Sequence, residues 1–103
     1  MKVYIAGKIT GNERYMEEFR AAEEDLEKTG CQVLNPAAVC SMLPEDLDYE
    51  EYMAVAFCLL EMADAVYFLE SWKDSKGANR EYGYAIGRGK KIIFERGEKS
   101  AKS

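Results

Sequence analysis

A polar segment over residues 75–81 combines the residue types and the spacing best suited to chemistry. Ser75 and Gly77 precede Glu81 in the run SKGANRE, which leads from a polar stretch into an expected helix. Free backbone N–H groups at the start of a helix bind anions, and a glycine lets an anion approach the backbone closely. Glu81 then lies within the first two turns of the helix, near the place where such an anion would bind. The same spacing is also typical of a serine N-cap with a nearby acid favoured by the helix dipole, so both interpretations stay open.

The residue types that the chain lacks narrow this chemistry further. Its 103 residues include no histidine, which excludes His-based triads, HExxH zinc sites and imidazole acid–base catalysis. Three cysteines without CxxC spacing, Cys31, Cys40 and Cys58, are typical of reduced thiols in a cytoplasmic protein. We therefore expect carboxylates, lysines, hydroxyls, phenols or thiols to do any chemistry, with no metal and no cofactor.

The overall charge bears on the partners of the protein. The chain has 14 basic and 19 acidic residues, a net charge of −5, whereas a protein that neutralises many phosphates needs a basic face. No apolar run is long enough for a signal peptide or a membrane span. We therefore expect a cytoplasmic domain that binds neither nucleic acid polymers nor membranes.

Short apolar runs alternate with longer segments of helical periodicity. The apolar runs lack polar alternation, which is typical of strands buried on both faces of a parallel sheet. The first helical segment follows Asn12 as a candidate N-cap, and the second follows Asp48, with Glu51 three residues on as in a capping box. Gly30 and Gly89 are placed to end the first and third helices. The strands are expected at residues 2–6, 31–34, 65–69 and 91–94, and the helices at 13–29, 49–62 and 77–88.

This βαβαβαβ order predicts a single doubly wound α/β domain, flavodoxin- or Rossmann-like, in which helices sandwich a parallel sheet of about four strands. We expect the domain to span residues 1–95 and residues 96–103 to form a disordered tail. In such sheets ligands bind beyond the carboxyl ends of the strands, where the strand order reverses. Loops 7–12, 35–48 and 70–76 are expected to meet there, with the chain near Glu95 beside them.

The first of these loops matches no standard nucleotide signature. Gly7 and Lys8 have the order found at the end of a P-loop, but Ile9 follows in place of serine or threonine. Lys2 occupies the position of the first P-loop glycine, and a GxGxxG motif is absent as well. Neither signature accounts for this loop.

Several segments taken together resemble one enzyme superfamily. They are VYIAGKITG near the start, NPA after the second strand, and ADAVYFLESWKDSKGANREYGYAIGRGKKI toward the end. Over residues 2–94 the chain resembles the nucleoside 2-deoxyribosyltransferase-like superfamily, and most of all its small phage and bacterial branch with an AGPITG-type start. The S-x-G-x-x-x-E spacing carries the resemblance, together with the Y-x-x-G start and the apolar strand before the segment.

The resemblance implies cleavage of the N-glycosidic bond of a 2′-deoxynucleoside or its 5′-monophosphate, with the sugar passed to water or to another base. By position, Glu81 would be the nucleophile that attacks the anomeric carbon. Ser75 and Gly77 would hold the 5′ group, and Tyr4 with the Gly7 loop would lie beside the sugar and base. A nearby carboxylate suits the oxocarbenium-like transition state of such a reaction. The resemblance also implies a small-molecule nucleoside or nucleotide as partner and a homo-oligomer, a dimer or tetramer.

The chain departs from the superfamily pattern at two positions. Lys8 stands where the branch usually has proline, and a lysine there is suited to contact a phosphate. Ala56 stands where the superfamily has an aspartate on the second helix, with Tyr52 and Tyr49 one and two turns earlier on that face. Trp72, on the loop before the third helix, is placed either to stack on a base or to cover a dimer seam.

Two other classes of function stay open. A nucleotide or phospho-sugar binding module, catalytically weak or inactive, fits the departures at Ala56 and Lys8. Ser75 and Glu81 favour the enzyme instead, because a carboxylate beside a phosphate lowers affinity and a pure sensor has no need of it. A structural protein would have its pocket filled by Trp72 or by tyrosines.

Overall fold

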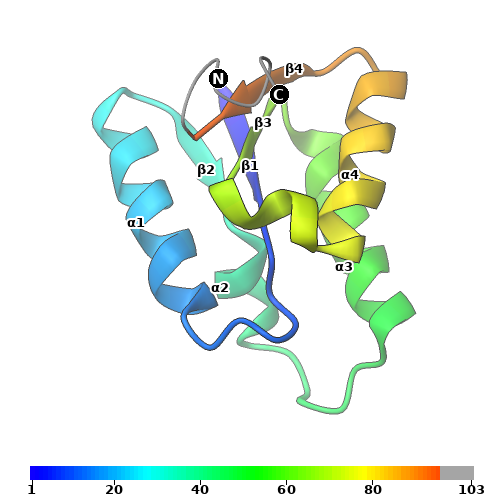
Figure 1. Ribbon diagram of the computed structural model, residues 1–103. Coiled ribbons are helices and arrows are strands. Elements are labelled where there is room, and N and C mark those ends of the chain that lie inside the picture. Colours follow the sequence, from blue (N-terminus) through cyan, green and yellow to red (C-terminus); the bar gives the residue numbers. More distant parts are fainter. Residues whose placement is uncertain (96–103) are drawn as a thin grey trace.

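The computed structural model describes residues 1–95 and contains a parallel sheet of four strands (Figure 1). The strands stand in the order β2-β1-β3-β4, so that β1 and β3 are central. Tyr4 of β1 lies opposite Leu34 of β2 on one side and Val66 of β3 on the other. The bounds are within one residue of the expected ranges: β1 (Lys2–Ala6), β2 (Gln32–Leu34), β3 (Ala65–Phe68) and β4 (Lys91–Phe94).

Two layers of helices cover the sheet. α1 (Tyr15–Lys28) and α2 (Pro36–Cys40) lie on one face, and α3 (Tyr49–Met62) and α4 (Lys76–Gly87) lie on the other (Figure 1). A short 3-10 helix, η1 (Glu70–Asp74), joins β3 to α4. A parallel sheet between two helical layers confirms the predicted doubly wound α/β fold.

The strands are apolar because both faces of the sheet are covered. Tyr4 and Phe68 lie in the core under α3 and α4, whereas Ile5 and Leu69 lie in the core under α1 and α2. All four side chains are at most 2% exposed. Buried apolar surface contributes about 25 cal/mol per Å² to the free energy of folding. Because neighbouring residues of a strand point to opposite faces, they stabilise the packing of the two helical layers in turn.

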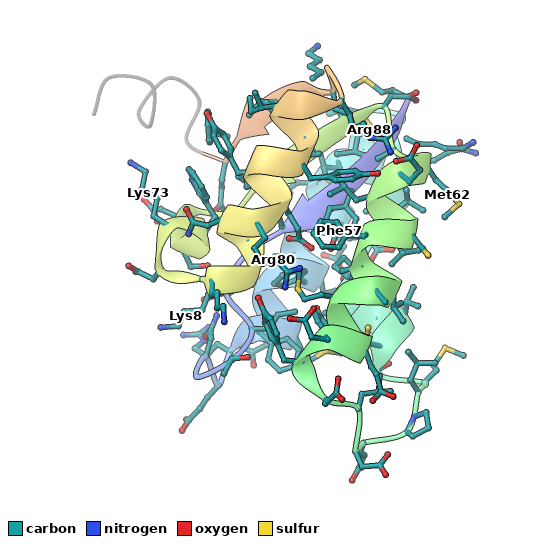
Figure 2. All side chains as sticks on the ribbon, turned by 90° about the vertical axis from the view of Figure 1, so that its right-hand side faces the viewer. Lys8, Phe57, Met62, Lys73, Arg80 and Arg88 are labelled. Carbon is teal, nitrogen blue, oxygen red and sulfur yellow. The ribbon has the colours of Figure 1, made fainter. Side chains whose placement is uncertain are left out.

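Arg80 links α4 to α3 near the start of both helices. Its guanidinium carbon lies 5.4 Å from the centre of the Phe57 ring and 5.6 Å from that of Tyr49, and its Nη1 pairs with the Glu50 carboxylate at 3.3 Å (Figure 2). The ion pair is exposed and contributes little, so the stacking over two rings is the more durable part of this link.

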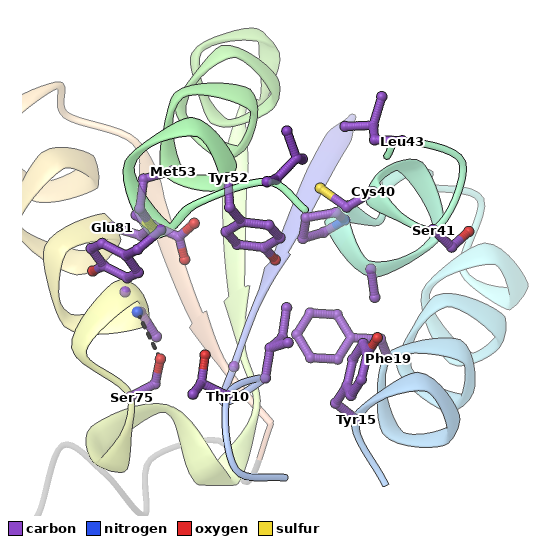
Figure 3. A pocket seen from close by; sticks show the side chains of 18 of the residues that line it. Thr10, Tyr15, Phe19, Cys40, Ser41, Leu43, Tyr52, Met53, Ser75 and Glu81 are labelled. Atoms are coloured by element: carbon purple, nitrogen blue, oxygen red, sulfur yellow. Dashed lines mark hydrogen bonds between the residues drawn. The ribbon is translucent and has the colours of Figure 1, made fainter. Parts of the chain in front are cut away.

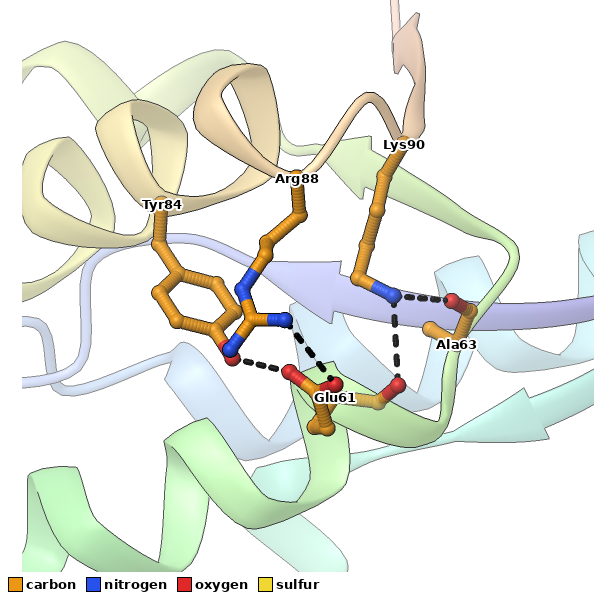
Figure 4. A network of polar contacts seen from close by, with 5 residues as sticks. All are labelled: Glu61, Ala63, Tyr84, Arg88 and Lys90. Carbon is orange, nitrogen blue, oxygen red and sulfur yellow. Dashed lines mark hydrogen bonds and ion pairs between the residues drawn. The ribbon is translucent and has the colours of Figure 1, made fainter.

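A second link joins the far ends of the same two helices. The Tyr84 hydroxyl donates to the Glu61 carboxylate, and Arg88 pairs with it at 3.4 Å (Figure 4). Lys90 Nζ donates to the backbone carbonyls of Glu61 and Ala63 at 3.1 and 2.7 Å. A lysine bonded to the last carbonyls of α3 stabilises that helix end and holds α4 beside it.

Asn12 does not cap α1, contrary to expectation. The helix begins at Tyr15 after Arg14, and Asn12 instead accepts a hydrogen bond from the Arg14 N–H at 3.1 Å. The Asn12 amide also donates to the Lys8 carbonyl at 2.9 Å. The side chain closes a turn with its own neighbours, which replaces the expected first turn of the helix.

The connection at residues 37–48 and the loop at 70–76 each contain a short helix that the sequence analysis missed. Asn35 accepts hydrogen bonds from the N–H groups of Ala37 and Ala38, and Pro36 suits the first helical position, so α2 forms directly after β2. In the second case, η1 occupies most of the expected loop.

The other predicted caps are present. Asp48 accepts from the Glu51 N–H at 2.8 Å, and Glu51 accepts from the Asp48 N–H at 3.0 Å, which completes the capping box of α3. Gly30 and Gly89 have positive φ angles, +89° and +69°, just after α1 and α4. Left-handed backbone at these positions explains why glycine follows both helices.

The expected tail, residues 96–103, lies outside the described residues. Within residues 1–95, no helix has the length and apolar character needed to cross a membrane.

The end of β1 leaves no room for a side chain at Gly7. A Cβ there would lie 2.8 Å from Cδ1 and 3.1 Å from Cβ of Leu69. We predict that Gly7→Ala lowers the free energy of unfolding by about 1–3 kcal/mol, the usual cost of overpacking. Urea unfolding measures this change.

Gly83 provides the matched control. It lies inside α4, where nothing is within 4 Å of an added Cβ, so Gly83→Ala should raise the free energy of unfolding by about 0.5–1 kcal/mol. Similar effects of the two substitutions would contradict the packing explanation for Gly7.

Candidate functional site

A cavity of about 560 Å³ opens at the carboxyl edge of the sheet (Figure 3). Its walls come from the loop after β1, residues 36–48 after β2, and the first turns of α3 and α4. It lies where the strand order reverses, because β2 stands on one side of β1 and β3 on the other. Pockets for small molecules span about 300–1,000 Å³, so this volume suits a small ligand.

Glu81 is the buried carboxyl group of this cavity. It lies in the second turn of α4, is 5% exposed, and points into the cavity beside Tyr52 (Figure 3). The Tyr4 hydroxyl of β1 donates a hydrogen bond of 2.5 Å to Glu81 Oε2. Burial raises the pKa of Glu81 to about 7, although the Tyr4 hydrogen bond and the Arg80 charge act to lower it. A carboxyl group perturbed in this way inside a cavity is typical of functional sites.

The amino end of α4 forms the wall next to Glu81. Ser75 is the N-cap, and its Oγ accepts a hydrogen bond from the Ala78 N–H at 3.0 Å (Figure 3). The first amides of the helix, those of Lys76 and Gly77, have no intrahelical partner. The Tyr49 hydroxyl lies near Gly77, buried and without a hydrogen-bond partner among the described residues. This wall presents several donors and is suited to an anionic or strongly polar group.

The opposite wall is apolar and aromatic. Tyr15 and Phe19 of α1 lie side by side there, and Pro36 and Leu43 complete it (Figure 3). Cys40 also lines the cavity, and burial raises the pKa of its thiol, which therefore stays protonated. Such a wall is suited to a flat ring, so the cavity has one polar side and one apolar side.

The cavity gathers four of the residues that the sequence analysis selected. Gly7, Ser75, Gly77 and Glu81 all line it, and Tyr4 reaches Glu81 from the core beneath. The spacing within residues 75–81 and the position of Gly7 at the end of a central strand are the signals that identified them.

Two of the selected residues do not line the cavity. Lys8 is half-buried, and its backbone N–H donates to Ser71 Oγ at 3.1 Å. Trp72 is 7% exposed and stacks on Tyr82 at 4.9 Å between ring centres, inside the core of its own chain. The η1 helix turns the tryptophan inward, so its ring packs in the core and does not reach the cavity.

Ala56 also lies away from the cavity. It is fully buried in the core between the sheet and α3 and α4. Tyr49, Tyr52 and Met53, one and two turns earlier, are the residues of α3 that line the cavity. These three residues belong to the first turns of α3, just after its Asp48 cap. Their place at the start of the helix is the sequence signal that could have identified them as cavity residues.

The cavity contains two further carboxylates that the sequence analysis did not select. Glu45 and Asp48 line it from the connection before α3, and both are exposed. Within residues 1–95, no three histidine, cysteine, aspartate or glutamate side chains are grouped so that they could hold a metal ion.

The buried carboxyl of Glu81 predicts a pH-dependent gain in stability on substitution by glutamine. Its pKa rises from the usual 4.5 to about 7 in the fold, so the group binds its proton more tightly in the folded chain. The stability from that proton is complete below pH 4.5 and is lost as the pH rises through 7. We expect Glu81→Gln to raise the free energy of unfolding at pH 8 by roughly 2–3 kcal/mol and to change it little at pH 4.

Urea unfolding of the wild type and of Glu81→Gln between pH 4 and 8 measures the difference between their free energies of unfolding. Glu24→Gln, at an exposed position on α1, is the matched control. Its free energy of unfolding should differ from that of the wild type by the same small amount at every pH. A constant difference between wild type and Glu81→Gln across that range would contradict the burial of an ionisable carboxyl.

Solved structures share this fold. A 2-deoxyribosyltransferase from Bacillus psychrosaccharolyticus matches with a TM-score of 0.73 and 21% identity, over 91% of this chain and 71% of that one. A conserved protein from Enterococcus faecalis V583 matches with a TM-score of 0.68 and 18% identity, over 91% of this chain and 62% of that one. At these identities the likeness shows a common fold.

Sequence comparison gives a more direct result. No curated protein sequence matches the chain. A family model described as a domain of unknown function, DUF4406, matches residues 1–94, which include the whole sheet, its helices and every residue that lines the cavity. The chain therefore belongs to the DUF4406 family.

Proposed function

We propose that the protein breaks the N-glycosidic bond of a 2′-deoxynucleoside or its 5′-monophosphate and passes the sugar to water or to another base. Glu81 is the proposed nucleophile. The observation that carries the proposal is the buried Glu81 carboxyl, held by Tyr4 and facing a cavity large enough for such a ligand. The fold shared with a 2-deoxyribosyltransferase supports the class of reaction.

The proposed reaction consists of two displacements at the same carbon. The ionised Glu81 attacks C1′, and the C1′–N bond breaks with its electron pair leaving on the base. Water or a second base then attacks C1′ and releases the Glu81 carboxylate. Tyr4 engages Oε2 of Glu81, which leaves Oε1 for the attack.

The amino end of α4 is proposed to hold the 5′ group. Ser75 Oγ accepts a hydrogen bond from Ala78, so its own hydroxyl proton remains to donate. The amides of Lys76 and Gly77 add two donors at the positive end of the helix dipole. Because Glu81 lies one turn further along the same helix, a sugar anchored there presents C1′ toward the carboxyl.

A catalytically weak or inactive module that binds nucleotides or phospho-sugars is the second candidate. The burial of Ala56 in the core favours it, since the position at which the superfamily carries an aspartate contributes nothing to this cavity. The remaining carboxylates of the cavity, those of Glu45 and Asp48, belong to its exposed side. Such a module would bind the same ligands and leave them intact.

One NMR experiment tests both candidates. The protein is mixed with the common 2′-deoxynucleosides and their 5′-monophosphates, saturation transfer reports binding, and the anomeric proton signal reports cleavage. We expect cleavage whose rate rises between pH 6 and 8 as Glu81 ionises. Glu81→Gln should lower the rate by about 10³-fold or more, as loss of a nucleophile does.

The outcomes separate the candidates. Glu24→Gln, at an exposed position of α1 that does not line the cavity, should leave the rate unchanged. Cleavage that survives Glu81→Gln would show that another group is the nucleophile. Binding without cleavage supports the binding module, and the absence of both signals contradicts the two candidates together.

A homo-oligomer, a dimer or tetramer, is part of the proposal through the resemblance to the superfamily. Exposed apolar side chains on α3 and α4, such as Met62 and Ile86 at 53% exposure each, are compatible with a surface that a second copy of the chain covers. Sedimentation at micromolar concentration should therefore give species heavier than the 11.7 kDa chain. A sample that sediments only as a monomer would contradict this part of the proposal.

A further inference from the structure

Tyr52 places a phenol in the middle of the cavity. Its ring extends from α3 between Glu81 on one side and Cys40 on the other, and its hydroxyl points into the open space (Figure 3). Glu81, Cys40 and Tyr15 all act on the titration of this phenol, which agrees with its central position. No hydrogen bond joins the Tyr52 hydroxyl to another residue within 1–95, so its donor is free for a ligand.

Several other polar groups of the cavity are less well placed for a group that leaves C1′. Tyr4 is occupied by Glu81, and Ser75 lies at the wall proposed for the 5′ group. Tyr15 lies on the opposite wall beside Phe19 (Figure 3). Asp48 caps α3 through the Glu51 N–H and is an acceptor when ionised.

We propose that the Tyr52 hydroxyl donates a hydrogen bond to the departing base when the glycosidic bond breaks. This assignment rests on the proposed function and adds a residue to it. It gives α3 a catalytic side chain one turn before Ala56, at a position that lines the cavity where Ala56 does not.

The step balances without a further reactant. A Glu81 oxygen forms a bond to C1′, the C1′–N bond breaks, and its electron pair moves onto the base. Tyr52 stabilises the negative charge that develops on the base by donating its O–H, and water in the open cavity then supplies the proton that the base takes up. Tyr52 keeps its own proton throughout.

The surroundings of Tyr52 favour a donor over a proton carrier. Burial, followed by the nearby Cys40 and Glu81, raises the pKa of Tyr52 well above its usual value. The phenol therefore stays protonated over the whole pH range in which Glu81 ionises. A neutral donor aimed at a developing anion is worth a factor of about 10 to 100 in rate, the range of hydrogen bonds to charged groups.

The test compares two substrates with Tyr52→Phe. 2′-Deoxyguanosine leaves as an anion unless a donor assists it, whereas 7-methyl-2′-deoxyguanosine already carries a positive charge and leaves as a neutral base. We expect Tyr52→Phe to lower kcat for the first substrate about 10- to 100-fold with little change in KM. For the methylated substrate the loss should be less than about threefold, because no charge develops on its base.

Two control variants keep the outcomes distinct. Tyr67→Phe removes a hydroxyl on the other face of the sheet, outside the cavity, and should leave both rates unchanged. Glu81→Gln should abolish cleavage of both substrates.

Equal losses on the two substrates, or no loss on either, would overturn the role of Tyr52 while the proposed function stands. If the wild-type protein cleaves neither of these substrates nor any of the 2′-deoxynucleosides and 5′-monophosphates of the NMR experiment, both assignments fall together. A loss confined to KM would make Tyr52 a binding residue and would also overturn the proposal.

Discussion

Keeping the Glu81 carboxyl out of water is the constraint on which the rest of the site depends. A carboxyl buried to this degree needs a hydrogen-bond donor, and β1 supplies it through the Tyr4 hydroxyl. That requirement ties the central strand of the sheet to the second turn of α4. It also explains why an otherwise apolar strand carries a tyrosine that faces the helices, since the ring fills the core and the hydroxyl serves the site.

The distance between α3 and α4 then determines the shape of the cavity. Gly77 lets the two helices approach, because a Cβ at that position would lie 3.1 Å from Met53 Sδ. The cluster around Glu61 holds the other ends of the helices together. With both ends fixed, the first turns of α3 and α4 face each other across the carboxyl edge of the sheet, and Tyr52 and Glu81 are brought to one cavity.

Much of this architecture could be predicted from the sequence, because the strands are buried on both faces and carry uninterrupted apolar runs. The grouping of Ser75, Gly77 and Glu81 was predictable as well, since all three belong to one helix start. The direction of Trp72 depends on how η1 winds, which is set by contacts distant in sequence. The rotation of α3, which buries Ala56, depends on packing against the sheet and α4. Only the position of Tyr52 just after the Asp48 cap marks it in the sequence as part of the helix end that lines the cavity.

The burial of Ala56 restricts how a second acidic group can enter this scaffold. An aspartate at that position would face the apolar core that includes Val66 and Phe68, and its charge would have no partner there. Burying an unpaired charge costs several kcal/mol, a large fraction of the net stability of a small domain. An engineered acid for this site therefore has to be introduced at a position that lines the cavity and is in contact with water, such as Thr10, and not at Ala56.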